Sequence, residues 1–68
     1  MTNTEVKNAM LTRLPVECKG ITYSRISAII YRPDDLGGVS VSLELLDKSG
    51  HSVTITHQKD VTLSDKSN

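Results

Sequence analysis

The chain has 68 residues, no formal net charge, and 37% hydrophobic residues that are mostly aliphatic and β-branched. This length accommodates one domain, residues 1–68, and its apolar content is too high for a disordered chain. Cys18 is the only cysteine, so an internal disulfide is excluded, and one Cys with two His cannot form a structural zinc site. A chain this short buries only about 60% of its unfolded surface, so we expect self-association to add stability.

The sequence contains no apolar run approaching the roughly 20 residues that span a membrane. Residues 1–7 lack the apolar stretch of a secretion signal, and a lone cysteine fits a reducing compartment. We therefore expect a cytoplasmic protein without a membrane partner.

Residues 4–14 are predicted to form a helix. Thr2 and Glu5 have the spacing of a capping box, in which each side chain accepts a hydrogen bond from the other residue's backbone N–H. Val6, Met10 and Leu14 recur every four residues as one apolar stripe. Pro15 is expected to end the helix, because a residue before proline disfavours the helical conformation.

A β meander is predicted over residues 16–63. Residues 16–18 alternate, and residues 21–31 form the longest β-rich run, in which the inward-facing residues change parity near Ser24 and Arg25. Such a change indicates a bulge or a sharp bend. Residues 28–31 are apolar on both faces, as in a central strand or a strand that contacts another subunit.

Two alternating segments after the loop at 32–38 predict a hairpin. Residues 39–45 and 51–57 flank a turn that ends at Gly50, which suits a three-residue loop with a glycine bulge. In that register Leu45 faces Val53, and Leu43 faces Ile55.

The order of elements predicts a mainly β fold with one N-terminal helix. After the hairpin, residues 61–63 form a last short strand and residues 64–68 a polar tail. We expect five strands in a small, strongly bent antiparallel barrel of SH3-like or Sm-like type, since an open sheet would leave two bare edges. An open sheet packed on the helix is the alternative.

Residues suited to catalysis or metal binding are scarce. Cys18 reads as a small buried side chain. His51 and His57 lie in one strand about 20 Å apart, so they cannot act together. Asp34 and Asp35 precede a glycine pair, which is ordinary turn chemistry. We therefore predict no catalytic residues, no cofactor and no metal, and hence no enzyme.

Charge divides the chain into a basic and an acidic half. Residues 6–33 carry five cations against one acid, and residues 34–68 carry six acids against three lysines. The halves could pair with each other, or the basic half could bind an anion. Tyrosine and arginine are enriched at interface hot spots. The candidate interaction residues are Arg25, Ile29, Tyr31 and Arg32. For nucleic acid the candidates are Lys7, Lys19, Arg25 and Arg32.

Two family resemblances extend this interpretation. The layout Asn8-Ala9, Leu14-Pro15-Val16 and Gly20-Ile21 resembles the bacterial Sm-like RNA chaperones, which implies a ring of subunits that binds RNA. This chain has Thr56-His57-Gln58-Lys59 where that family has a tyrosine-lysine-histidine run.

Residues 26–31, Leu45-Leu46-Asp47-Lys48 and Val53-Thr54-Ile55 are similar to small uncharacterised prophage proteins of Gram-positive bacteria. This resemblance implies a phage-related origin and no particular activity. The sequence thus predicts a non-catalytic protein-interaction or self-assembly module, with itself or another protein as partner. A small barrel that contacts RNA or DNA backbone is the alternative.

Overall fold

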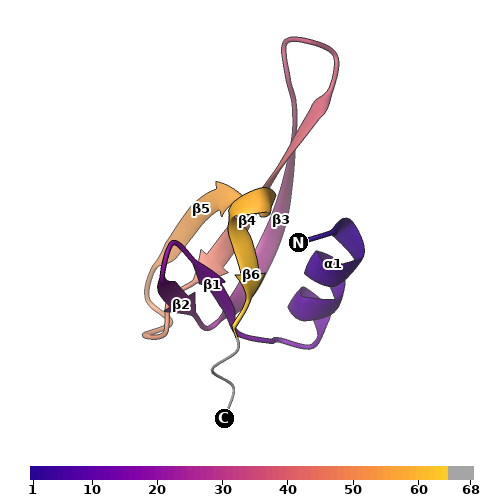
Figure 1. The fold of residues 1–68 in the computed structure, drawn as a ribbon. Coiled ribbons are helices and arrows are strands. Elements are labelled where there is room, and N and C mark those ends of the chain that lie inside the picture. The colour runs from indigo at the N-terminus through magenta and orange to yellow at the C-terminus, as the bar shows by residue number, and fades with distance from the viewer. Residues whose placement is uncertain (65–68) are drawn as a thin grey trace.

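The computed structural model describes residues 1–64 and contains one N-terminal helix and two three-stranded antiparallel sheets (Figure 1). The elements in chain order are α1 (Asn3–Leu11), β1 (Val16–Cys18), β2 (Ile21–Tyr23), β3 (Arg25–Pro33), β4 (Val39–Leu46), β5 (Val53–His57), the 3-10 turn η1 (Gln58–Asp60) and β6 (Val61–Leu63). The first sheet has the order β2-β1-β6 and the second β3-β4-β5. The predicted mainly β fold with an N-terminal helix is confirmed.

The predicted closed barrel, SH3-like or Sm-like, is wrong. Six strands form rather than five, and among the described residues no strand of one sheet pairs with a strand of the other. The strands of the first sheet have only three residues each, and β1 already has β2 and β6 as its two neighbours. The sheets and α1 instead enclose one core, made of Val6, Ala9, Val16, Cys18, Tyr23, Ile26, Leu43, Leu45 and Val61.

The start of α1 follows the sequence pattern, but its end does not. The Glu5 backbone N–H donates to Thr2 Oγ1 at 3.2 Å and the Thr2 N–H to Glu5 Oε1 at 2.8 Å, so the capping box is confirmed. The helix ends at Leu11, before the predicted residue 14, because Arg13 takes a positive φ of 56°. This conformation lets the N–H groups of Arg13 and Leu14 bond back to the last turn, as in a Schellman motif.

The early helix end also changes the predicted apolar stripe. Val6 and Ala9 are the buried residues of α1, and Met10 is half-buried. Leu14 lies beyond the helix and is 42% exposed, so it does not belong to the stripe. The side of α1 that faces the core is therefore formed by Val6, Ala9 and Met10.

The predicted change of face near Ser24 is confirmed as a passage between sheets. Tyr23 ends β2 with its side chain buried, and Ile26, three residues on, is buried from β3. Ser24 lies between them and donates its N–H to the Leu46 carbonyl at 2.8 Å. A bulge between Ile26 and Ala28 then shifts the register again. The residue run predicted as one strand is thus two strands in different sheets.

The hairpin of β4 and β5 forms, but its predicted register is wrong by one residue. Leu46 pairs with Val53 and Leu45 with Thr54. The loop is longer than predicted because the Asp47 N–H bonds to the Ser52 carbonyl at 2.9 Å. A one-residue shift moves every side chain of a strand to the other face. Val53 and Ile55 are consequently about half exposed, at 50% and 48%.

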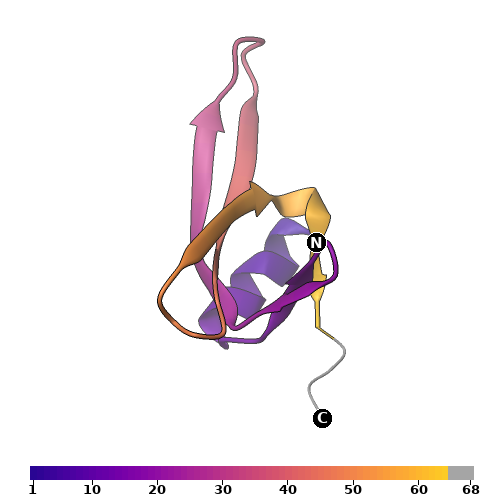
Figure 2. The same cartoon turned by 90° about the vertical axis from the view of Figure 1, so that its left-hand side faces the viewer.

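Strands β3 and β4 continue well beyond the rest of the molecule (Figures 1 and 2). We call residues 31–41 the arm; it makes the molecule 42 Å long against 24 and 21 Å in the other directions. β5 stops at His57, opposite Ser42, so the arm is two-stranded. The predicted loop at 32–38 is shorter, with β3 reaching Pro33 and β4 beginning at Val39.

The chain end differs slightly from the predicted tail. Ser64 donates its N–H to the Pro15 carbonyl at 3.2 Å and therefore continues beside β1. The remainder of the predicted tail, residues 65–68, lies outside the described residues.

Candidate interaction site

One face of the arm is apolar. The core pair Ile29–Leu43 is followed outward by Tyr31 opposite Val41 and Pro33 opposite Val39. Alternation places these pairs on the same face as the core. Tyr31 is 63% exposed and Val39 is 62% exposed. We call Tyr31, Pro33, Val39 and Val41 the arm face; it continues the core surface into solvent.

The tip of the arm adds a leucine that is held out by a well-bonded turn. Leu36 is 95% exposed. The Asp34 carboxylate accepts the N–H groups of Leu36 and Gly38, both at 2.9 Å, and Gly37 takes a φ of 83° that favours glycine. The prediction that Asp34 serves a turn is confirmed. Its carboxylate bonds to backbone rather than to a nearby arginine.

The two edges of the arm differ in their backbone groups. The Asp34 N–H bonds to the Gly38 carbonyl, and antiparallel ladders alternate between bonded and non-bonded pairs. The backbone groups of Val39 and Val41 therefore point away from β3. Those of Val41 lie opposite Gln58, the residue after β5, and those of Val39 lie beyond it. On the opposite edge, Pro33 has no N–H to present, as is typical of an edge strand.

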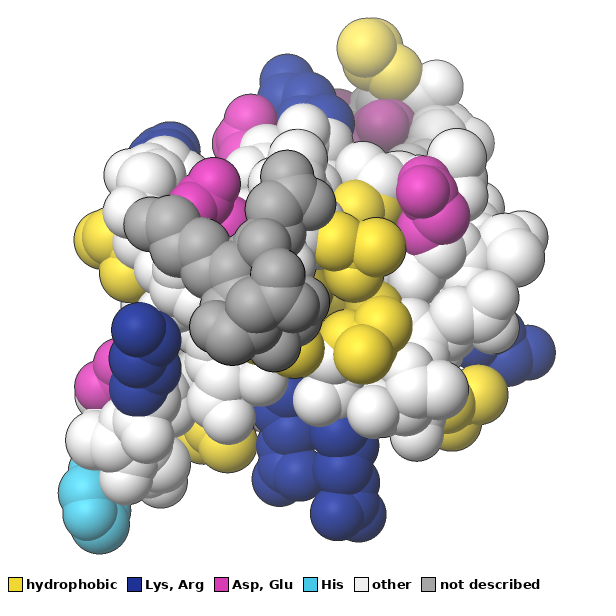
Figure 3. Space-filling model, turned by 60° about the horizontal axis from the view of Figure 1, so that its bottom comes forward, with side chains coloured by type: hydrophobic (Ala, Val, Ile, Leu, Met, Phe, Trp, Pro, Cys, Tyr) yellow, Lys and Arg dark blue, Asp and Glu magenta, His cyan; other side chains and the backbone are white. Residues whose placement is uncertain are grey.

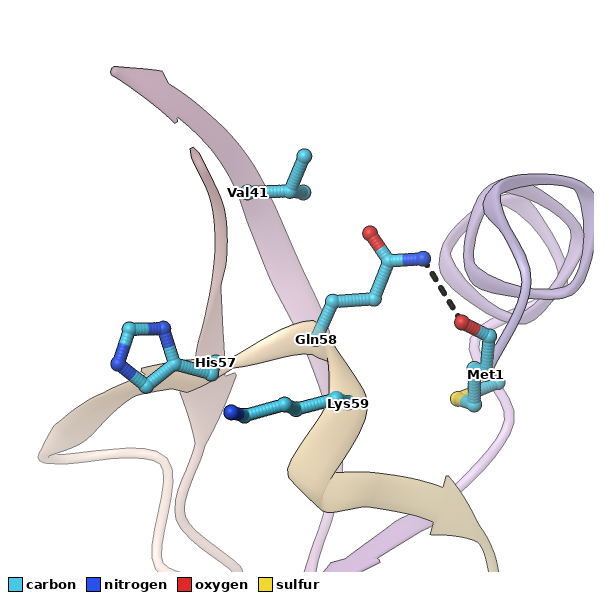
Figure 4. A pocket seen from close by; sticks show the side chains of 5 residues that line it. All are labelled: Met1, Val41, His57, Gln58 and Lys59. Atoms are coloured by element: carbon cyan, nitrogen blue, oxygen red, sulfur yellow. Dashed lines mark hydrogen bonds between the residues drawn. The ribbon is translucent and has the colours of Figure 1, made fainter. Parts of the chain in front are cut away.

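A hollow of about 330 Å³ lies at the base of the arm (Figure 4). Its lining residues, which define what we call the base hollow, are Met1, Val41, His57, Gln58 and Lys59. Gln58 Nε2 donates to the Met1 carbonyl at 2.7 Å, and in Figure 4 His57 and Lys59 extend away from Met1. The walls are apolar on the Met1 and Val41 side, and Lys59 contributes a positive charge.

The four predicted interaction residues are divided between the two faces of β3. Tyr31 lies on the arm face, and Ile29 lies at its foot, half-buried against the core. Arg32 pairs with Ser40 and Arg25 with Leu46, and alternation puts both arginines on the opposite face. Tyr31 and Ile29 thus share one face of β3, and the two arginines lie on the other.

The sequence interpretation missed Leu36 and Val39. A leucine between Asp35 and Gly37 in a turn is an unusual place for an apolar side chain, and this was the available signal. Val39 was assigned to a core-facing strand. Val39 does lie on the same face of β4 as the buried Leu43, but the elements that cover the core do not extend to it.

The predicted nucleic-acid residues are dispersed. Lys7 lies on α1, Lys19 in the turn between β1 and β2, and Arg25 and Arg32 at opposite ends of β3, about 20 Å apart along the strand. Figure 3 shows Lys and Arg side chains at several separate places, with the largest group at the lower edge of that view. Arg25 does share a hollow of about 190 Å³ with Arg13, a residue that the sequence interpretation had not included.

The groups capable of catalysis do not converge. Cys18 is 5% exposed, and its Sγ lies 3.5 Å from Thr56 Oγ1. Within residues 1–64 no three His, Cys, Asp or Glu side chains are grouped so that they could hold a metal ion. No helix in this part of the chain is long and apolar enough to cross a membrane.

Two carboxyl groups have a lowered pKa, and both serve local structure. Hydrogen bonds from Thr2, the backbone N–H first, lower the pKa of Glu5. The Ser49 hydroxyl and the Lys48 N–H lower the pKa of Asp47. Neither carboxyl belongs to the arm or to the base hollow.

Comparison with known proteins adds no assignment. No protein-family model matches the chain, and searches of curated proteins and of solved structures find no match either. The two family resemblances drawn from the sequence therefore stay predictions, and the function rests on the geometry of the arm.

Proposed function

We propose that this protein is a non-catalytic interaction and self-assembly module, and that the arm is its contact element. The observation that carries this proposal is the exposure of Tyr31, Leu36 and Val39 on a two-stranded projection. Apolar side chains gathered on one exposed surface are typical of protein interfaces. Tyrosine is among the residues that contribute most to binding.

The energetics of a two-stranded arm favour the same interpretation. An isolated hairpin is at best marginally stable in water. The arm gains no cover from β5, because β5 ends opposite Ser42. A partner that covers the arm face would bury apolar area worth roughly 25 cal/mol per Å² and would extend the sheet. Association therefore supplies the cover that the described part of the chain does not.

The test is light scattering over a wide concentration range with the full chain and the variants Tyr31→Ser and Val39→Ser. We expect concentration-dependent association of the native chain and a shift of at least tenfold toward the monomer for each variant. Val53→Ser is the matched control, since Val53 is also about half exposed, at 50%, but lies away from the arm. Equal association by all four proteins would contradict the proposal.

A second candidate function, contact with nucleic-acid backbone, is supported by the hollow that Arg13 and Arg25 share. Two guanidinium groups at one hollow suit a phosphate, and phosphate binding weakens steeply with salt. Anisotropy of short labelled RNA and DNA at low and moderate salt tests this candidate. It requires binding that Arg13→Gln reduces and that Lys48→Gln leaves unchanged. Absence of binding at low salt rules it out.

A further inference from the structure

We infer that the arm binds a second copy of this chain, with the tip of each arm placed in the base hollow of the other copy. This inference rests on the proposed function, because it requires the arm to be a contact element. It adds the identity of the partner, the direction in which the arms run, and the charged pair that holds each tip.

The position of the hollow points to antiparallel arms. Val41 and Gln58 line the base hollow where β5 ends, and Val39 continues the same edge of β4 beyond Gln58. Two arms placed side by side in opposite directions along this edge bring each tip to the base of the other. A tip cannot reach its own hollow, because Leu36 and Val41 are separated by about 16 Å of extended chain.

The free backbone groups suit such a pair. Antiparallel strands exchange N–H and carbonyl groups between residues that both point toward the partner strand. Val39 points outward beyond Gln58, so the Val39 residues of two copies can pair with each other across a two-fold axis. The contact uses one surface twice and closes on itself, as expected of a symmetric dimer.

The tip and the hollow are chemically complementary. The tip offers the exposed Leu36 and the carboxylate of Asp35, since that of Asp34 is bonded to the turn. The hollow offers the apolar surface of Met1 and the ammonium group of Lys59. Leucine on an apolar wall and Asp35 beside Lys59 give the contact both packing and a defined orientation.

A contact of standard size would cover a modest share of this chain. A standard interface buries about 800 Å² per partner, which is about a sixth of the 4785 Å² surface of this chain. Residues 31–40 are all exposed, so the arm and the base hollow are open to a contact. The formal net charge of zero means that two copies do not repel each other overall.

A charge-exchange experiment tests the pair directly. In the full chain, Asp35→Lys and Lys59→Glu should each weaken dimerisation at least tenfold, as measured by sedimentation equilibrium. An equimolar mixture of the two variants should recover dimerisation to near the native level. In the mixed dimer each tip meets a hollow of opposite charge, and native mass spectrometry distinguishes this heterodimer by mass.

Controls separate this contact from other effects. Lys48→Glu changes an exposed lysine in the turn between β4 and β5 and should leave dimerisation unchanged. Leu36→Asp should abolish dimerisation, whereas Leu11→Asp, at a residue 67% exposed at the end of α1, should not. Circular dichroism and thermal unfolding confirm that each variant is folded.

The outcomes separate the placement of the tip in the hollow from the role of the arm as a contact element. Single variants that dimerise like the native chain, or a mixture that fails to recover, overturn the placement of tip in hollow. If Tyr31→Ser and Val39→Ser still reduce association in that case, the arm remains a contact element. A native chain that stays monomeric at every concentration overturns the second copy as partner.

Discussion

The inner and outer halves of the β3–β4 pair share their strand structure but differ in the exposure of their side chains. The inner half contains Ile26, Leu43 and Leu45, which are at most 1% exposed, while the outer half contains Tyr31 and Val39, which are more than 60% exposed. Both halves belong to one ladder, which a bulge between Ile26 and Ala28 interrupts in the inner half and which alternates without interruption from Ala28 to Pro33. The difference lies in what covers them: α1 and the first sheet lie over the inner half, and no described element lies over the outer half. Alternation therefore predicts the direction of a side chain but not its burial.

The largest expected change in the free energy of unfolding comes from a substitution in the inner half. Leu45→Ala should lower the free energy of unfolding by about 2–5 kcal/mol, because it removes a fully buried side chain from the core. Val39→Ala, on the same strand and face, should change it by less than about 0.5 kcal/mol in the monomer. Urea unfolding at low protein concentration measures both values. Equal losses would show that the arm is covered like the core.

Removing the helix cap tests how strongly α1 supports the inner half. Thr2→Ala deletes the side chain that accepts the Glu5 N–H, and it should cost about 1 kcal/mol of stability. Thr4→Ala is the matched control, since Thr4 is exposed and makes no part of the capping box. Thermal unfolding followed by circular dichroism compares the two. A similar loss in both variants would mean that the cap itself contributes little.

Acidification should lower the stability that the loop between β4 and β5 contributes to the fold. The Ser49 hydroxyl and Lys48 N–H hold the pKa of Asp47 below the ordinary 3.8, so the folded state favours its charged form. This contribution is present above the ordinary pKa and disappears as the pH falls through the lowered one. In the Asp47→Asn variant, the free energy of unfolding should therefore fall less as the pH drops below about 4 than it does in the native chain. An unchanged acid limb in urea titrations at several pH values would contradict this account.

The smallest expected change in stability comes from a substitution that tests the register of β5. Ile55→Thr should change stability by less than about 0.5 kcal/mol, because Ile55 pairs with Glu44 on the outward face. In the register predicted from the sequence, Ile55 would face Leu43 in the core and the same change would cost severalfold more. Urea unfolding of this variant beside Leu45→Ala decides between the two registers.

The parts of the fold that depend on neighbouring residues were predictable. The capping box, the break at Ser24 and the turn at Asp34 all follow from residues a few positions apart. The register of β5 was not, because the Asp47 side chain bonds to Ser49 and Ser52 and supports a longer loop. The alternating pattern of residues 51–57 favours the predicted register, which would bury Val53 and Ile55, and the longer loop overrides that pattern.

The barrel prediction was wrong for a different reason. Closure depends on which strands meet across the whole chain, and three-residue strands such as β1 and β6 carry little sequence signal about their partners. Tyr31 and Ile29 were candidates because the run to which they belong is apolar on both faces, and both lie on the side of β3 that faces the arm face or its foot. The projection of the arm could not be found, since it results from β5 being shorter than β4.

The pairing of β1 with β6 has a consequence for the order in which the chain folds. Val16 and Leu63 are partners although 46 residues separate them, whereas β3, β4 and β5 each pair with a neighbour in sequence. Contacts this distant cost more chain entropy to close and form slowly. During synthesis the second sheet can assemble as it emerges, while the first sheet must wait for its last strand. Until β6 pairs, β1 has β2 as its one strand neighbour in the described chain.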